Sequence, residues 1–478
     1  MKKKLFLYGA GKRCRDLCKI LQQSDYEIIA ILDSNPDTWG KVIEGCCIEA
    51  PDIINSLKEV EACITVADIN ARQAIRKTLQ QKYQYDLTRE VNYNSLILEV
   101  YRNDVNIRKV MQNQDIPPDC KENVLFDCYN GLGLGGVEAW TKDICSALIK
   151  SGQNNIYIIS DQGSYAVSDD LINHILKVGI NHDERFSRAT ILNLVKTIIS
   201  KLPCKVVTCT TNEVMLAAYL VKCYYPDLIT VISVIHNSNE SVYENYLDFK
   251  ECSDFYIGVS LDILDDMINR GVKPDRITSM TCPFACEREL ERKYTEDITQ
   301  PVRLGYAGRM EYSQKRMDLL LKCVELLEEK KVCFRLEVAG DGIARKEMET
   351  FINKKHLKRK VKFLGKLTRE EMSSFWKQQD ICVNFSDFEG RCISIIEAMG
   401  NGAVPIVTAT SGVKEDILDG ENGYIVPIGD YRAIAERVEY LSYNREALQI
   451  MGAMAHKAVY PKSMMEEHLN FWNKILNF

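Results

Sequence analysis

The chain has 478 residues, a length that predicts about three domains rather than one compact module. Hydrophobic residues make up 46% and charged residues 27%, which is typical of a folded globular protein. The formal net charge of −6 argues against a general affinity for nucleic acid. The 18 cysteines include no CxxC spacing, which disfavours a zinc site and fits reduced thiols in the cytoplasm.

Two stretches imitate export or membrane signals. The start of the chain is basic and then apolar, but Gly9 and Gly11 interrupt the apolar run too early for a signal peptide. The most apolar later stretch, 215–235, is interrupted by Lys222 and Asp227 and falls short of the ~20 apolar residues of a spanning helix. We therefore expect a cytoplasmic protein that does not cross a membrane.

The pattern of the whole chain predicts the α/β class. Apolar runs followed by segments of helical period recur along the sequence, as in parallel sheets with crossover helices. Polar and charged stretches divide this pattern. We predict a first domain at 1–105, a linker at 106–121, a second domain at 122–285, a third at 302–460 and an amphipathic C-terminal helix at 461–478.

The first domain opens like a dinucleotide-binding unit. A strand ending at Tyr8 leads into Gly9 and Gly11, and Asp33 ends the next strand, where a ribose-binding carboxylate is expected. Cys14 replaces the third glycine of that motif. Two alternatives stay open: a nucleotide or sugar-nucleotide site, or a domain that only holds partners, including other copies of the chain in an oligomer. The pattern resembles the small Rossmann-like module often fused to bacterial surface-polysaccharide enzymes.

The second domain has a glycine-rich turn and a histidine at predicted strand ends. Gly135 and Gly136 precede a helix over 137–150, where backbone amides can approach an anion or a sugar hydroxyl. A tight turn without a ligand is the alternative. His236 follows the strand 231–235, at the edge where ligands bind in parallel sheets, and is either a site residue or a structural histidine.

The third domain has two cations where a strand meets a helix. The strand 302–307 leads into Gly308 and Arg309, and Lys315 stands just before the helix 317–328. Together these cations are suited to a diphosphate, which Arg can bind bidentately. Solvated surface charges are the alternative.

Two carboxylates and a helix N-terminus follow a later strand of the same domain. Glu389 is predicted on the loop after this strand, and Glu397 about one turn inside the next helix. The amides between them, from Gly390 to Ser394, are free to hold phosphate oxygens and sugar hydroxyls. We expect one carboxylate to contact a transferred sugar and the other the two ribose hydroxyls.

Taken together, these motifs resemble a glycosyltransferase of GT-B fold from the large retaining family 4. The resemblance covers 122 to the C-terminus and is carried by Gly135-Gly136-Val137-Glu138, His236-Asn237, Gly308-Arg309 with Lys315, Ala339-Gly340-Asp341-Gly342, Glu389 with Glu397, and Gly412 to Glu415. It implies two Rossmann-like domains that face a cleft, with the donor mainly on the C-terminal one and the acceptor mainly on the other. It also implies that the C-terminal helix packs across both.

The resemblance also implies roles for particular residues. The catalytic residues are expected to be His236, Glu389, Arg309 and Lys315, which act by positioning and electrostatics. The donor-binding residues are expected to be Gly136, Gly308, Arg309, Lys315, Asp341, Gly390, Arg391, Cys392, Ile393 and Glu397. No metal or other cofactor is expected, because the chain has no DxD motif and the two cations can stabilise the departing diphosphate.

The implied enzyme is a retaining hexosyltransferase that uses a nucleotide-sugar donor, with a UDP-sugar favoured. The acceptor is a glycan or a lipid-linked molecule in bacterial cell-surface polysaccharide assembly. Two other hypotheses stay open. One is a catalytically silent GT-B scaffold that binds a nucleotide-sugar or a partner enzyme. The other is an NAD-dependent oxidoreductase or epimerase acting through the first domain, which has no suitable Tyr-x-x-x-Lys pair.

Three further expectations concern single features. Arg391 stands where the family often has an aromatic residue, and it either reads an acidic or phosphorylated group of the donor or points to solvent. The basic amphipathic stretch 185–201 either contacts the inner membrane face peripherally or, as we favour, packs on the core. A chain that begins near Pro118 is expected to fold and to retain donor binding.

Overall fold

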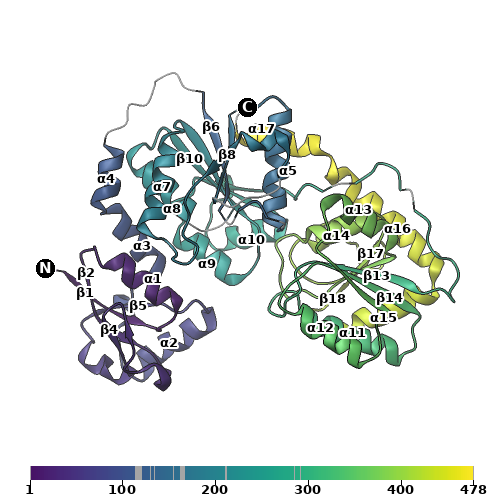
Figure 1. The fold of residues 1–478 in the computed structure, drawn as a ribbon, viewed down its shortest axis with the longest axis horizontal. Helices are drawn as coiled ribbons and strands as arrows, with labels where there is room; N and C mark the ends of the chain where they lie inside the picture. The colour runs from purple at the N-terminus through teal and green to yellow at the C-terminus, as the bar shows by residue number, and fades with distance from the viewer. Residues whose placement is uncertain are drawn as a thin grey trace. The chain divides into compact units, whose positions relative to one another are not determined.

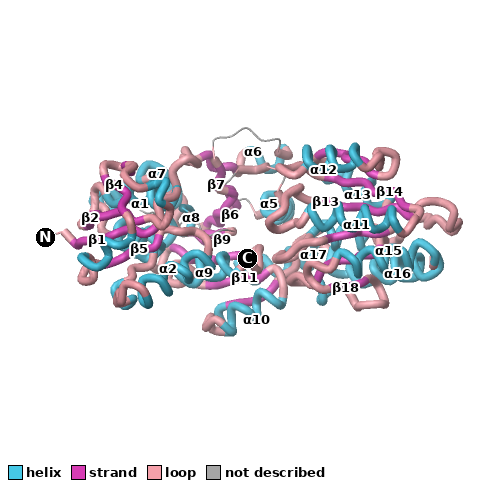
Figure 2. The backbone as a smooth tube through the Cα atoms, turned by 90° about the horizontal axis from the view of Figure 1, so that it is seen from below, coloured by secondary structure: helices cyan, strands magenta, loops and turns pink. Residues whose placement is uncertain are grey.

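The structure is a computed structural model that describes residues 2–112, 121–129, 131–133, 135–153, 155–161, 167–209, 213–284, 286–290 and 292–476. It confirms the α/β class, with three largely parallel sheets (Figure 1; strands are magenta in Figure 2). The chain divides into two compact units, Met1–Val234 with Asn239–Tyr256, and Ile235–Ser238 with Ile257–Phe478.

The N-terminal sheet has five strands in the order β3-β4-β2-β1-β5, all parallel except the β3–β4 pair. The strands are β1 Lys3–Tyr8, β2 Tyr26–Leu32, β3 Val42–Ile43, β4 Cys46–Glu49 and β5 Glu61–Ile64, with helices α1 Lys12–Leu21 and α2 Ile69–Gln81 and 3-10 turns at Pro36–Thr38, Pro51–Ser56 and Leu87–Arg89. Leu5, Phe6 and Leu7 are buried in succession, as expected for a strand covered on both faces.

Two helices connect this sheet to the next one. They are α3 (Tyr93–Arg102) and α4 (Val105–Met111), and the Asn92 and Asp104 side chains cap their N-termini. The predicted linker, 106–121, is therefore helical up to Met111, where α4 ends. Residues 113–120 lie outside the described residues.

The second sheet has seven strands in the order β12-β11-β10-β9-β6-β7-β8. They are β6 Asn123–Cys128, β7 Ile156–Ser160, β8 Ile175–Lys177, β9 Cys204–Thr208, β10 Ile229–Ile235, β11 Phe255–Gly258 and β12 Ile277–Ser279. The accompanying helices are α5 Gly136–Lys150, α6 Asp169–Ile172, α7 Arg188–Ile199, α8 Glu213–Tyr224, α9 Glu240–Asp248 and α10 Leu261–Asn269, with a 3-10 turn at Pro274–Arg276.

Helix α7 decides between the two alternatives for the basic amphipathic stretch. Its apolar side chains Ile191, Leu194, Val195 and Ile198 are fully buried, and the helix packs against α8 and α4. The core-packing alternative is therefore the observed one. Within the part of the chain that the structure describes, no helix is both long and apolar enough to span a bilayer.

The third sheet has six parallel strands in the order β15-β14-β13-β16-β17-β18. They are β13 Val302–Ala307, β14 Phe334–Ala339, β15 Val361–Gly365, β16 Ile381–Asn384, β17 Val404–Thr408 and β18 Tyr424–Val426. The accompanying helices are α11 Met317–Glu329, α12 Arg345–Lys354, α13 Arg369–Gln378, α14 Ile393–Gly400, α15 Tyr431–Tyr443, α16 Arg445–Val459 and α17 Met465–Leu476, with 3-10 turns at Val413–Glu415 and Tyr460–Ser463.

The strand order of the third sheet positions the candidate site. The chain winds outward from β13 to β14 and β15 on one side, and from β16 to β17 and β18 on the other. The loops after β13 and β16 therefore leave the carboxyl edge of adjacent strands at the point where the winding reverses, which is where open α/β sheets bind ligands. The helix predicted at the C-terminus is present as α17, and its packing across the domains stays a prediction.

Candidate functional site

The loop after β13 is folded around the carboxylate of Glu311. This carboxylate accepts hydrogen bonds from the amides of Ser313 at 2.8 Å, Gln314 at 3.1 Å and Lys315 at 2.8 Å. Burial works to raise the pKa of Glu311, but the bonds from the Ser313 hydroxyl and these amides outweigh it, so its pKa is lowered. An ionised Glu311 thus fixes the loop that carries Arg309 and Lys315. Glu311 belongs to none of the motifs found in the sequence.

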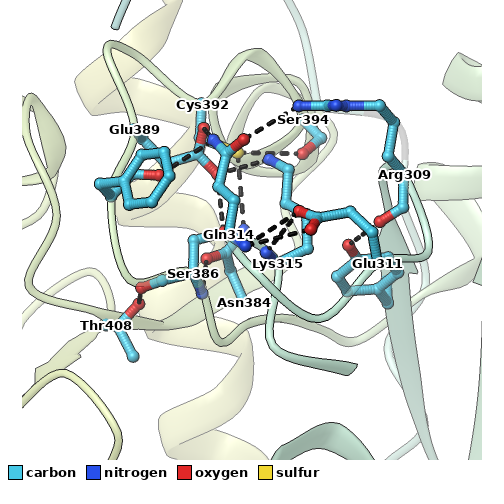
Figure 3. Close-up of polar contacts among 12 residues, drawn as sticks. Arg309, Glu311, Gln314, Lys315, Asn384, Ser386, Glu389, Cys392, Ser394 and Thr408 are labelled. Carbon is cyan, nitrogen blue, oxygen red and sulfur yellow. Dashed lines mark hydrogen bonds and ion pairs between the residues drawn. The ribbon is translucent and has the colours of Figure 1, made fainter. Parts of the chain in front are cut away.

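The structure brings Lys315 and Glu389 together (Figure 3). Their side chains form an ion pair, and Lys315 and Glu389 are only 11% and 8% exposed. The Ser386 hydroxyl donates a second bond to the same carboxylate oxygen at 2.7 Å. Burial works to lower the pKa of Lys315, and the charge and hydrogen bond of Glu389 more than compensate, so its pKa is raised. Lys315 is therefore a permanent cation at physiological pH.

Arg309 reaches this pair through Gln314, a residue that the sequence analysis missed. The Arg309 Nη2 donates to Gln314 Oε1 at 2.9 Å, and Gln314 Nε2 lies 3.3 Å from the second oxygen of Glu389. The only signal in the sequence was the position of Gln314 immediately before Lys315. The arrangement places two cations and one carboxylate at the carboxyl edge of β13 and β16, as expected.

At Gly390 the backbone passes very close to another segment of the chain, the one at His236. A Cβ atom there would lie 2.0 Å from the carbonyl oxygen of His236, so no other residue fits without moving the chain. Asn237 and Gly390 form an antiparallel bridge, and the Ser238 hydroxyl donates to the carbonyl of Glu389. Main-chain contacts therefore join the segments that carry His236 and Glu389, two of the expected catalytic residues.

His236 is electrically neutral at physiological pH. Burial lowers its pKa to about 3, because the charged imidazolium loses its hydration. A group with this pKa does not titrate between pH 5 and 9. His236 is thus not a cation that could bind a phosphate.

The structure excludes the solvent-facing alternative predicted for Arg391. It is only 2% exposed, so it does not point to solvent. Its guanidinium donates to both carboxylate oxygens of Asp416, at 2.6 and 2.7 Å, and to Glu415 at 2.5 Å. Lys462 donates to Asp416 from the other side at 2.7 Å. The charge of Arg391 is therefore paired within the chain, and its contact with an acidic or phosphorylated donor group stays a prediction.

Replacing Arg391 with alanine is expected to destabilise the fold by about 3–5 kcal/mol, the usual cost of breaking a buried ion pair from one side. Two acidic groups, of which Asp416 is almost fully buried, would keep only the charge of Lys462. Chemical denaturation measures the difference in the free energy of unfolding. Replacing Lys462, which is 35% exposed, is the matched control and is expected to cost much less. Equal stability of R391A and the wild type contradicts the assignment.

The neighbouring donor-site candidates lie at the start of α14. Cys392 precedes its first residue, Ile393, and makes no side-chain cap, so the helix N-terminus keeps free backbone donors. The Cys392 sulfur lies 3.2 Å from the Ser394 hydroxyl, and burial raises the pKa of its thiol. Glu397 lies one turn inside the helix and is half-buried.

The turns after β13 and β14 pack directly on each other. A Cβ on Gly340, whose φ is +126°, would lie 1.9 Å from the carbonyl oxygen of Gly308. The amide of Met310 donates to the carbonyl of Asp341 at 2.9 Å, and the Asp341 carboxylate accepts the amide of Gly342 at 2.8 Å. Gly308 and Asp341 are therefore placed beside Arg309, as expected for one site.

The remaining candidates lie outside this cluster. Gly136 is the first residue of α5 and belongs to the other compact unit. In the N-terminal sheet, the Asp33 carboxylate accepts the amides of Ala10 at 2.7 Å and Asn35 at 2.8 Å, next to Gly9 and Gly11. Asp33 therefore connects the glycine turn to the end of β2 through a hydrogen bond. The nucleotide site at this turn stays a prediction. Among the described residues, no three His, Cys, Asp or Glu side chains are grouped so that they could hold a metal ion.

Comparisons with known proteins show which enzymes the chain resembles. Residues 287–458 match the family model described as glycosyl transferases group 1, and residues 1–91 match the model described as C2185-like, N-terminal. Over 275 residues the chain is 23% identical to N-acetyl-alpha-D-glucosaminyl L-malate synthase of Bacillus anthracis, a match that covers 54% of this chain and 71% of that enzyme.

Two further similarities concern acceptor and donor chemistry. The chain is 26% identical over 175 residues to the poly(ribitol-phosphate) alpha-N-acetylglucosaminyltransferase of Staphylococcus aureus, covering 36% of this chain and only 35% of that enzyme. Its fold is similar to HepE of Anabaena in complex with UDP and glucose, with a TM-score of 0.61, 15% identity, and coverage of 75% and 100%.

These findings define the class of the protein. The fold is GT-B with an additional N-terminal sheet. The protein is a glycosyltransferase, an enzyme of the EC 2.4 class.

Proposed function

We propose that the protein transfers a sugar from a UDP-sugar to a glycan or lipid-linked acceptor in bacterial cell-surface polysaccharide assembly, with retention of configuration and without a metal ion. The observation that carries the proposal is the cluster of Lys315, Arg309 and Glu389 at the winding reversal of the third sheet. A diphosphate and a sugar hydroxyl are the ligands that such cations and such a carboxylate bind. The UDP in the structure of the similar HepE supports the choice of nucleotide.

The proposed roles follow from this cluster. Lys315 and Arg309 neutralise the negative charge that develops on the diphosphate as the bond from the sugar C1 to the phosphate oxygen breaks. The acceptor hydroxyl oxygen forms the new bond to C1, and its proton passes to the departing phosphate oxygen. Glu389 accepts hydrogen bonds from hydroxyls of the transferred sugar, and Glu397 accepts those of the ribose.

The other predicted donor residues supply the surroundings. The start of α14, at Cys392 and Ile393, directs backbone amides toward phosphate oxygens. Gly340 lets the loops after β13 and β14 approach each other closely at Gly308 and Asp341, and Gly390 lets the loop after β16 approach His236. Gly136 is proposed as a further backbone contact. The neutral His236 acts at the reacting centre through hydrogen bonding and not through charge.

Donor binding and turnover are expected to persist in excess EDTA. The measurement is thermal unfolding with UDP-, GDP-, ADP- and CDP-sugars, followed by detection of free UDP released from the donor that stabilises the protein. A donor at 100 times its Kd stabilises the native state by about 2.7 kcal/mol through mass action. Loss of UDP release in EDTA, with recovery on adding Mg²⁺ or Mn²⁺, contradicts metal independence. Stabilisation by GDP-sugars alone contradicts the choice of UDP.

A further inference from the structure

One side chain connects two charged groups that come from different loops of the site. Gln314 is 7% exposed and lies between Arg309, on its own loop, and Glu389, on the loop after β16 (Figure 3). Both backbone polar groups of Gln314 are hydrogen-bonded. The amide donates to Glu311 at 3.1 Å, and the carbonyl accepts the amide of Asp387 at 2.9 Å. The side chain therefore extends from a fixed base.

The Gln314 side-chain amide bonds to three neighbours. Its Oε1 accepts from Arg309 at 2.9 Å, and its Nε2 donates to the carbonyl of Phe388 at 3.0 Å and to Glu389 Oε2 at 3.3 Å. A guanidinium only donates, whereas a carboxylate and a carbonyl only accept. Only one orientation of the amide satisfies all three partners. A side chain of this length must both donate and accept at its tip to replace it, which glutamate, methionine and lysine do not do.

The two oxygens of Glu389 have different partners. Oε1 accepts from Lys315 and, at 2.7 Å, from Ser386, while Oε2 accepts from Gln314. Bonds to one oxygen alone leave a carboxylate free to pivot about that oxygen. The bond from Gln314 to the second oxygen sets the plane of the carboxylate, and the same amide sets the place of the Arg309 guanidinium.

We propose that Gln314 is a positioning residue that aligns Glu389, which contacts the transferred sugar, with Arg309, which contacts the diphosphate. The bond that breaks during transfer lies between these two parts of the donor. A displacement of about 1 Å between groups that flank a reacting bond costs up to about a hundredfold in rate. This inference rests on the proposed function, because it requires a donor that meets both side chains.

The test uses two substitutions of similar size in the full-length protein, Gln314→Glu and Gln314→Met. Both remove the donation to Glu389, and only Gln314→Glu keeps an acceptor for Arg309. The probes are UDP, UDP-glucose and UDP-N-acetylglucosamine, with calorimetry for binding and UDP release for turnover. We expect turnover at pH 8 to fall at least tenfold in both variants. Affinity for free UDP should stay within about threefold of the wild type, because Lys315 still holds the diphosphate.

A pH profile separates positioning from a general loss of structure. In Q314E the introduced carboxylate and Glu389 repel each other, and one proton shared between them at lower pH restores a donor to Glu389. The ratio of Q314E to wild-type turnover is therefore expected to rise about tenfold from pH 8 to pH 5. In Q314M this ratio is expected to stay constant. Tyr312→Phe, which removes only a bond from the same loop to Glu347, is the control and should behave as the wild type.

Each outcome decides the inference. Turnover of both variants within threefold of the wild type overturns it. The inference is also overturned if turnover falls in parallel with thermal stability and with the affinity for free UDP at every pH. Gln314 would then only hold the loop in place. A wild-type protein that binds neither UDP nor any UDP-sugar overturns the proposed function itself, and the positioning role with it.

Discussion

Replacing Lys315 with methionine is expected to lower the turnover of a UDP-sugar by a factor of about 10² or more. The Lys315 ammonium is the permanent, almost fully buried cation of the site, and its attraction to a departing diphosphate grows as the bond to the sugar breaks. Loss of Arg309, replaced by alanine, should have a similar effect for the same reason. Steady-state UDP release measures both effects.

The control must separate catalysis from stability, because K315M also leaves the buried Glu389 without its cation. Adding Glu389→Gln removes the uncompensated charge, so the double variant should regain thermal stability without regaining turnover. Lys322→Met, at an exposed position on α11, should leave turnover unchanged. Near-wild-type turnover of K315M would remove the cation from the proposed mechanism.

Deletion of 1–117 is expected to prevent stable folding of what remains, contrary to the expectation from the sequence pattern. The N-terminal sheet and most of the second sheet belong to one compact unit, with α3 packed on α8 and α9, and α4 on α7. Tyr101, Ile107 and Met111 are buried there, and their removal exposes the apolar surfaces of these helices. Soluble yield, circular dichroism and UDP binding of the shortened chain measure the result. A folded shortened chain that binds UDP would restore the modular interpretation.

A point substitution tests the same interface in the complete chain. Tyr101 is fully buried on α3, and its hydroxyl donates to the carbonyl of Phe186. Y101A is expected to lower the free energy of unfolding by about 3–5 kcal/mol, as for other buried aromatic side chains. Y101F keeps the ring and should cost only the hydrogen bond, about 1 kcal/mol. If Y101A costs no more than Y101F, the packing of this interface contributes nothing to stability.

Ion pairs and hydrogen bonds reinforce this interface, and the sequence offered no sign of them. Arg72 on α2 pairs with Glu244 on α9, and Asn94 on α3 donates to Asp248 at 2.9 Å. The partners are more than 150 residues apart in the chain. Local patterns revealed two separate sheets but not that the helices between them dock, because docking depends on which surfaces meet.

The sequence, through its family resemblance, predicted that Arg309, Lys315 and Glu389 belong to one site, and the structure brings the three side chains together. Each stands next to a predicted strand end, and the carboxyl ends of parallel strands lie at one edge of a sheet. The α/β fold class followed from the recurrence of apolar runs and segments of helical period along the chain. These properties depend on local backbone geometry, which short stretches of sequence encode directly.

Only the tertiary structure decided how the side chains of the site are used. Arg391 bonds to residues 24 and 25 positions further along the chain, and Gln314 bonds to Glu389 across 75 positions. Such partners are set by strand order and by the packing of loops on one another, and no local pattern in a single sequence encodes them. Arg391, predicted either to contact the donor or to face solvent, forms buried ion pairs with Glu415 and Asp416. Gln314, which belongs to no motif, connects the Arg309 guanidinium to the Glu389 carboxylate.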